Sequence, residues 1–294
     1  MIRDIAGRQN HSVRLARKLL KKKHRRERGL LVCEGMDLLW AAVEAGADVR
    51  EVLVRRDLVG GLPAVLVETA ATHDSMDPSV NVGVCDEETL DYASSLGGGV
   101  DVIFICVEPA WSLADVPMTA GVTFYLDNVG DPGNVGTVVR SALAFGLAGV
   151  ICSPGTADPY GPKAMRAGMG AQFGLPVVVE VSCADLQARF EAARAKGETA
   201  PEVWVSDPHH GDDIRAASLT AGTVIVLGGE RTGPGSEWPA ARRVTIPQAR
   251  FDSLNVAMAG TIFAYECCRA LPLDLGGNRQ SGPLVSSAPK EGPS

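Results

Sequence analysis

Apolar and polar positions in the first third of the chain alternate in short blocks, which predict an α/β unit. Apolar runs of strand length occur at residues 29–33, 49–54, 80–84 and 102–107. Segments with helical spacing of apolar positions occur at residues 10–23, 34–45, 62–71 and 86–93. Strands that alternate with helices of this length indicate a mixed or parallel sheet covered by helices.

The same alternation starts again after a break at residues 109–121. The break carries Pro109 and Pro117 and few apolar residues, so we interpret it as a linker. Beyond it, strands are predicted at residues 122–126, 149–152, 176–179, 203–205, 224–227 and 244–246. Helices are predicted at residues 135–145, from the end of a 153–162 loop to residue 169, at 184–195 and at 253–271. The pattern predicts two α/β domains, residues 1–108 and 122–272, and a disordered Gly-, Pro- and Ser-rich tail at 273–294.

Composition limits the class of protein. A chain of 294 residues with 46% hydrophobic content can form two modest cores. Apolar runs stay well short of eighteen residues, so we expect no membrane span. The N-terminus lacks the apolar core of a secretion signal. The seven cysteines lie mostly in apolar runs without CxxC pairing, which predicts reduced thiols in a cytoplasmic protein and argues against zinc. The His209-His210 pair has no converging ligands in the sequence, so no metal is expected.

The charge is distributed unevenly. Residues 3–28 hold 11 of the 28 Lys and Arg residues and two acidic residues, a local net charge of +9, while the whole chain has −7. Such a segment is either a solvated helix face or a surface that binds a polyanion. Val13, Leu15, Leu19 and Leu20 interleave with the charges and favour an ordered helix whose basic side contacts phosphates, with strong salt dependence.

Three segments after residue 127 point to one chemistry. They are residues 128–140 (NVGDPGNVGTVVR), 227–234 (LGGERTGP) and 246–256 (IPQARFDSLNV), the first, second and third motifs below. Each begins where a strand-like run ends, and each contains glycine, proline or small polar residues that let the backbone approach a ligand. Their glycines do not fit the dinucleotide-binding fingerprint, which requires a glycine-rich turn after the first strand.

In order and spacing, the three motifs resemble those of SpoU-type (TrmH-like) RNA ribose 2′-O-methyltransferases of the SPOUT superfamily. The resemblance implies an α/β fold with a deep trefoil knot that binds S-adenosylmethionine. The Cys33-Glu34-Gly35 segment and the helix after it resemble the start of an L30e-like RNA-binding domain. We therefore expect S-adenosylmethionine-dependent 2′-O-methylation of a ribose in structured RNA, rRNA more than tRNA. A non-catalytic RNA-binding or assembly factor with the same fold is the alternative.

The resemblance assigns site residues. Its catalytic positions are Asn134, Arg140, Glu230, Ser253 and Asn255, and its cofactor positions are Leu227, Gly228, Gly229, Ile246, Gln248 and Leu254. Arg166 matches a basic residue that the family uses for RNA binding or catalysis. The charge pattern adds five RNA contacts: Lys21, Lys22, Lys23, Arg25 and Arg26. By their place in the sequence alone, Asn134 and Ser253 are also good helix N-caps.

Two positions depart from the family pattern, and the role of one residue stays open. Arg231 replaces a small residue, and Gln248 stands where methionine is commoner. Arg140 is either a surface side chain or a placed cation. Because a guanidinium stays protonated, we favour phosphate binding over a role as general base, which remains the second option.

The resemblance also implies a homodimer formed through the last helix. Small residues there would allow a partner helix to approach closely, though they suit burial within one subunit equally well. They are Val256, Ala257, Gly260, Thr261, Ala264 and Cys268.

Overall fold

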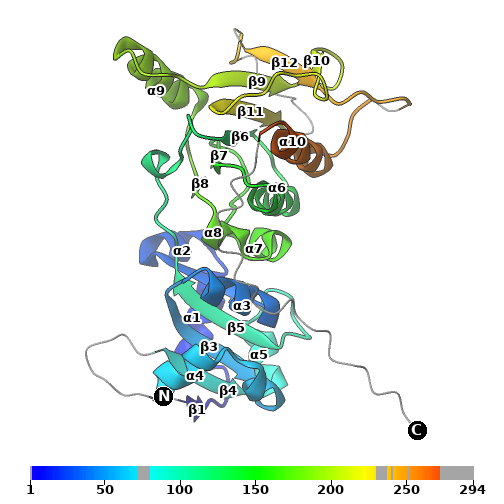
Figure 1. Ribbon diagram of the computed structural model, residues 1–294. Helices are drawn as coiled ribbons and strands as arrows, with labels where there is room; N and C mark the ends of the chain where they lie inside the picture. The colour runs from blue at the N-terminus through cyan, green and yellow to red at the C-terminus, as the bar shows by residue number, and fades with distance from the viewer. Residues whose placement is uncertain (1, 72–79, 230–236, 240, 251, 272–294) are drawn as a thin grey trace.

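The protein folds into two α/β parts, each built on its own sheet (Figure 1). The computed structural model describes residues 2–71, 80–229, 237–239, 241–250 and 252–271. In this part of the chain, no helix combines the length and the apolar character needed to cross a membrane. The predicted tail lies outside the described residues.

The first sheet is mixed and has the order β1-β4-β3-β5-β2. Its strands are β1 (Ile2–Asp4), β2 (Leu30–Glu34), β3 (Val49–Arg55), β4 (Asn81–Cys85) and β5 (Val102–Val107). Its helices are α1 (His11–Leu19), α2 (Lys22–Arg28), α3 (Met36–Glu44), α4 (Ala64–Ala71) and α5 (Glu87–Ala93), with a 3-10 turn at Arg56–Gly61. The β1, β4 and β3 strands run parallel, whereas β5 runs antiparallel to both β3 and β2. The predicted mixed sheet is confirmed.

The second sheet is parallel throughout and has the order β10-β12-β9-β11-β6-β7-β8. Its strands are β6 (Val122–Asp127), β7 (Gly149–Cys152), β8 (Val177–Val178), β9 (Glu202–Ser206), β10 (Asp212–Asp213), β11 (Thr223–Gly228) and β12 (Arg242–Thr245). Its helices are α6 (Pro132–Ala144), α7 (Pro162–Gly168), α8 (Ala171–Gly174), α9 (Cys183–Ala195) and α10 (Val256–Ala270). The knot implied by the resemblance stays a prediction.

Helix α7 and helix α8 lie between the two sheets (Figure 1). The largest apolar cluster contains Phe104 of the first sheet and Phe124 of the second. A Cβ atom on Gly170 would lie 3.0 Å from Leu38 Cδ1 and from Ala41 Cβ of α3. Packing this close fixes the two parts against each other.

The segment predicted as a linker is packed against the second sheet. Val116 and Met118 are 2% and 6% exposed and belong to an apolar cluster with Tyr125 and Val226. A short 3-10 turn, Leu113–Asp115, begins at Ser112 with a capping box. The few apolar residues of this segment are therefore enough to pack it on the second sheet.

The helix predicted over residues 10–23 is two helices. Helix α1 ends at Leu19, and Lys21 is extended (φ −90°, ψ 125°) before α2 starts. The Arg25 guanidinium donates to the carbonyls of Leu19 and Leu20 at 2.9 and 3.0 Å. These carbonyls need partners where the helix stops, so Arg25 stabilises the break.

Candidate active site

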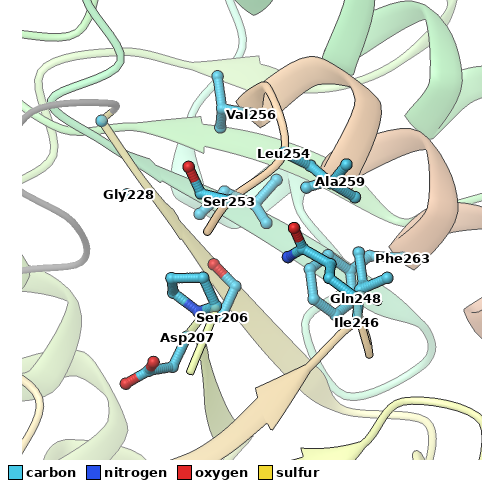
Figure 2. Close-up of a pocket in the computed structure, with 13 residues that line it drawn as sticks. Ser206, Asp207, Gly228, Ile246, Gln248, Ser253, Leu254, Val256, Ala259 and Phe263 are labelled. Atoms are coloured by element: carbon cyan, nitrogen blue, oxygen red, sulfur yellow. The ribbon is translucent and has the colours of Figure 1, made fainter. Parts of the chain in front are cut away.

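A cavity of about 150 Å³ lies beyond the carboxyl ends of β9, β11 and β12, against α10 (Figure 2). Ligand sites in parallel sheets form at this edge. The cavity is lined by Ser206, Asp207, Pro208, Leu227, Gly228, Gly229, Ile246, Gln248, Ser253, Leu254, Val256, Ala259 and Phe263. The structure thus brings all six predicted cofactor positions together around one space.

The cavity combines an apolar wall with a polar side chain. Leu227, Val256 and Phe263 are buried and form part of its wall. The Oε1 atom of Gln248 is buried and has no hydrogen-bond partner within the described residues. An unsatisfied buried acceptor costs about 1–3 kcal/mol, so this atom is poised to accept a hydrogen bond from a ligand. The departure from the family pattern at Gln248 therefore supplies a polar contact inside the cavity.

Glycine is required where the first and second motifs meet. A Cβ atom on Gly229 would lie 2.3 Å from the carbonyl oxygen of Asn128. The Gly229 N–H donates to the carbonyl of Asp127 at 2.8 Å. Asn128 itself has a left-handed backbone (φ 54°). The two loops are thus held backbone to backbone beside the cavity.

The first and third motifs meet through two asparagine side chains. Asn255 Nδ2 donates to Asn134 Oδ1 at 3.2 Å. Asn255 is also the N-cap of α10, since its Oδ1 accepts from the N–H groups of Ala257 and Met258. The expected cap at Ser253 was wrong, because the helix starts after Asn255.

Asp131, and not Asn134, caps α6. The helix begins at Pro132, three residues earlier than predicted, and Asp131 Oδ1 accepts from the N–H of Asn134 at 3.0 Å. Proline favours the first helical position, so the Asp-Pro pair was a usable signal for this start. Because Asp131 performs the capping, the Asn134 side chain is available to contact Asn255.

Arg140 lies on a different side of helix α6 from Asn134. The stripe that faces α10 contains Asn134, Val138 and Ser141, whose Oγ is 2.7 Å from Thr261 Oγ1. Arg140 is six residues after Asn134 and shares the stripe of Gly133 and Gly136, which faces α7. The side chain is exposed and makes no ion pair within the described residues. A free, exposed guanidinium suits phosphate binding. Glu230, the remaining predicted catalytic residue, lies outside the described residues.

Two of the basic residues predicted to contact RNA form ion pairs within the protein instead. Arg25 is 3% exposed and pairs with Asp158 at 2.5 Å. Arg166 pairs with Glu34 of the first domain at 2.5 Å. Arg25 cannot face a phosphate because it is buried, so that assignment was wrong. Sequence spacing could not reveal the pairing, since Asp158 is 133 residues away.

The other basic positions predicted to contact RNA are exposed. Lys22 and Arg26 both contact Glu180, at 3.4 and 2.6 Å, and these hydrogen bonds, that of Arg26 first, lower the pKa of Glu180. Lys23 lies 3.8 Å from Glu27. Lys21 makes no ion pair within the described part of the chain.

Burial makes several of the cysteines poor nucleophiles. Six of the seven are buried and all are free, as the sequence predicts. Burial raises the pKa of Cys152, Cys183 and Cys267 to about 12. Thiols with such values stay protonated at neutral pH. Covalent catalysis through these groups is therefore not supported.

Six residues that line the cavity were not predicted as site residues from the sequence: Ser206, Asp207, Pro208, Val256, Ala259 and Phe263. Ser206 is the last residue of β9, and Asp207 and Pro208 follow it. Asp207 pairs with Arg243 at 2.6 Å and accepts from the N–H groups of His209 and His210, contacts that lower its pKa against the effect of burial. The available signal was position, because the carboxyl end of a parallel strand faces the same edge as its neighbours.

Comparison with known proteins gives a consistent result. The model of the SpoU rRNA Methylase family matches residues 121–265, and that of the MRM3-like substrate binding domain matches residues 10–94. The chain is 36% identical to 23S rRNA (uridine(2479)-2′-O)-methyltransferase of Streptomyces viridochromogenes over 58% of this chain and 60% of that protein. It is 26% identical to 23S rRNA (guanosine(2553)-2′-O)-methyltransferase RlmP of Bacillus subtilis over 90% of this chain and 98% of that protein. The crystal structure of the SpoU methyltransferase AviRb from Streptomyces viridochromogenes in complex with AdoMet superposes with a TM-score of 0.75 and 28% sequence identity. The superposition covers 89% of this chain and 98% of that chain.

Proposed function

Because this chain belongs to the SpoU rRNA methylase family, we propose that it transfers the methyl group of S-adenosylmethionine to the 2′-hydroxyl of a ribose in ribosomal RNA. The observation that carries the proposal is the cavity: six cofactor positions assigned from two separated motifs, the second and the third, line it together. The alternative, a binding-only factor, gives no reason for a cavity that all six of these positions line, or for the Asn134–Asn255 hydrogen bond of 3.2 Å.

The residues around the cavity fit the cofactor. Gln248 Oε1 is ready to accept a hydrogen bond, and the backbone at Gly228 and Gly229 is free of side chains. Leu227, Ile246 and Leu254 offer apolar contact. When bound there, S-adenosylmethionine supplies an electrophilic methyl group.

The chain's own polar groups then orient the attacking hydroxyl. Arg140 grips a phosphate beside the target ribose through its bidentate fork. Asn134 and Asn255, held together at 3.2 Å, define where the hydroxyl lies next to the cavity. As the O–CH₃ bond forms, the S–CH₃ bond would break with a neutral sulfide as the leaving group, and the hydroxyl proton would pass to the neighbouring phosphate or to water. Proton transfer to Arg140 is the less favoured option, because a guanidinium is already protonated.

The basic helices of the first domain hold the RNA backbone. Arg14, Lys18 and Lys21 are exposed and make no ion pair within the described residues, and Lys23 is exposed beside Glu27. We assign phosphate contacts to these residues in preference to Lys22 and Arg26, which are occupied by Glu180. A cytoplasmic location is part of the proposal and fits the free cysteines.

A homodimer is the proposed assembly. The small residues of α10 do not form its surface, since Val256, Ala257, Gly260 and Ala264 pack within the subunit. The opposite side of α10 exposes Met258 (60%), Ile262 (36%) and Tyr265 (52%). This apolar face can pack on its copy. A monomer in light scattering at micromolar concentration would contradict the proposal.

Two measurements test the function. Calorimetry should show S-adenosylmethionine binding, and mapping of ribose methylation on total RNA with and without the protein should show one added 2′-O-methyl site in rRNA. Gly229→Val is the matched variant, because its side chain would collide with the Asn128 carbonyl and should abolish cofactor binding. Failure of the wild type to bind millimolar cofactor would favour the binding-only factor.

A further inference from the structure

A buried carboxylate joins the two domains. Glu34 is the last residue of β2, and its side chain is 1% exposed. Its oxygens accept from Ser95 N (2.6 Å), Ser94 Oγ (3.2 Å), Ser95 Oγ (2.9 Å) and Arg166 Nη1 (2.5 Å). The serines belong to the same domain as Glu34, whereas Arg166 belongs to α7 of the second domain. A carboxylate this buried depends on a paired cation, and Arg166 supplies it from across the interface.

Helix α7 is in turn fixed tightly to α6. A Cβ atom on Gly136 would lie 2.2 Å from the Ala164 carbonyl oxygen, so the two backbones are in direct contact. Near the start of both helices, Lys163 Nζ lies 2.7 Å from Asp131 Oδ2. Asp131 caps α6 and accepts from the N–H of Asn134. Any shift of α7 therefore moves the turn that carries Asn134.

We propose that Arg166 is a positioning residue and not an RNA contact: through Glu34 it fixes α7, and with α7 the first turn of α6, relative to the substrate-binding domain. RNA held by the first domain is thereby presented to Asn134 at a set distance. The inference rests on the proposed function, because it assigns a role in the methyl-transfer site.

The geometry disfavours direct contact of Arg166 with a phosphate. Its Nη1 donates to both Glu34 and Ser95 Oγ, at 2.5 and 2.9 Å, and the side chain is 28% exposed. A phosphate that drew the guanidinium away would leave Glu34 charged, buried and without its cation, which is strongly unfavourable.

The test compares Glu34→Gln, Arg166→Gln, their combination and Arg166→Lys. Glu88→Gln is the matched control, since it breaks the exposed Arg8–Glu88 pair (3.0 Å), both of whose members belong to the first domain. Single-turnover methylation should fall on the order of 10- to 100-fold in both single variants, because misplacement of a site by about 1 Å costs this much. The double variant should be no worse than either single one, and Arg166→Lys should recover part of the rate. Cofactor affinity should stay at the wild-type value.

RNA binding distinguishes positioning from contact. For a positioning residue, the salt dependence of RNA binding in Arg166→Gln stays that of the wild type. The loss of one phosphate contact would lower the slope of log K against log salt by about 0.7–0.9. If Arg166→Gln shows that fall and Glu34→Gln methylates normally, the proposal is overturned. If Glu34→Gln fails to fold, Ser95→Ala removes one bond to Glu34 and one to Arg166 and should lower the rate less steeply; a wild-type rate there would also count against positioning.

Amide hydrogen exchange tests the coupling without activity. Glu34→Gln should speed exchange in α7 and in the first turn of α6, and leave β11 unchanged. If the wild type methylates no RNA but this change in exchange occurs, the proposed function fails and the coupling stands. Unchanged exchange in α7 refutes the coupling itself.

Discussion

Asn255 donates a hydrogen bond to Asn134, and this bond links two helix starts that are 121 residues apart in the chain. Its Nδ2 donates to Asn134 Oδ1 while its Oδ1 accepts from the first N–H groups of α10. Both the capping of α10 and the contact with α6 therefore depend on one amide group. Replacement of only one half of that amide separates the two roles.

Asn255→Asp should keep the cap and lose the link. Aspartate caps helices as well as asparagine, but it presents a carboxylate to the Asn134 oxygen where the amide donated. We expect single-turnover methylation to fall by about tenfold or more, since loss of one hydrogen bond and added repulsion cost over 1 kcal/mol. Thermal unfolding should shift little. Asn10→Asp, at the N-cap of α1, is the control and should leave the rate unchanged.

Arg140→Lys separates phosphate binding from base catalysis. Lysine keeps the charge but lacks the bidentate fork, so the rate should fall steeply and remain measurable. The pH profile should then run parallel to that of the wild type. Lysine titrates near pH 10, so a large relative gain in rate between pH 7 and about 10 would instead identify a base. Arg140→Ala should lose activity and keep cofactor binding, because the cavity lies in other segments.

Neutralising Arg14, Lys18 and Lys21 together should weaken RNA binding. Their charges are exposed and unpaired within the described residues, so each phosphate contact contributes about 0.7–0.9 to the salt slope, and the slope should fall by about two. Filter binding across a salt series measures this. The matched variant neutralises Lys22 and Arg26, which form ion pairs with Glu180. It should change the salt dependence of RNA binding less. A larger effect in the matched variant would reverse the assignment.

Gly136→Ala should destabilise the second domain. The added methyl group would meet the Ala164 carbonyl at 2.2 Å and Ala167 Cβ at 2.8 Å. Forcing extra volume into such a contact costs about 1–3 kcal/mol of unfolding free energy. Gly130→Ala is the control, because a Cβ atom there meets nothing within 4 Å. Denaturant unfolding of both variants gives the difference, and equal stabilities would show that α6 and α7 can move apart.

Strands buried on both faces were predictable, and strands that depend on a neighbour were not. The run at Val102–Val107 is apolar at every position, and its predicted bounds match β5. β1 (Ile2–Asp4) has one apolar residue in three and forms by pairing with β4, so its own sequence carries little signal. The same holds for β10 (Asp212–Asp213), which pairs with β12.

Site residues could be predicted from the sequence where they belong to motifs with a distinctive composition. Gly228, Gly229 and Ile246 belong to such loops and line the cavity. Arg25 illustrates the limit, since an arginine in a basic run gives no sign that it will be buried against Asp158. Pairing across 133 residues depends on the packed domains and not on local pattern.

The order in which the cavity can form follows from the pairing of β6 with β11. Asp127 lies opposite Gly228, so the two central strands of the second sheet meet only after about a hundred more residues have been synthesised. The first sheet needs no residue beyond Val107 and can fold early. Contacts between residues far apart in sequence form slowly. On the ribosome, we therefore expect the RNA-holding domain to be complete while the methylation site is still open, so that a nascent chain engages RNA before it is able to modify it.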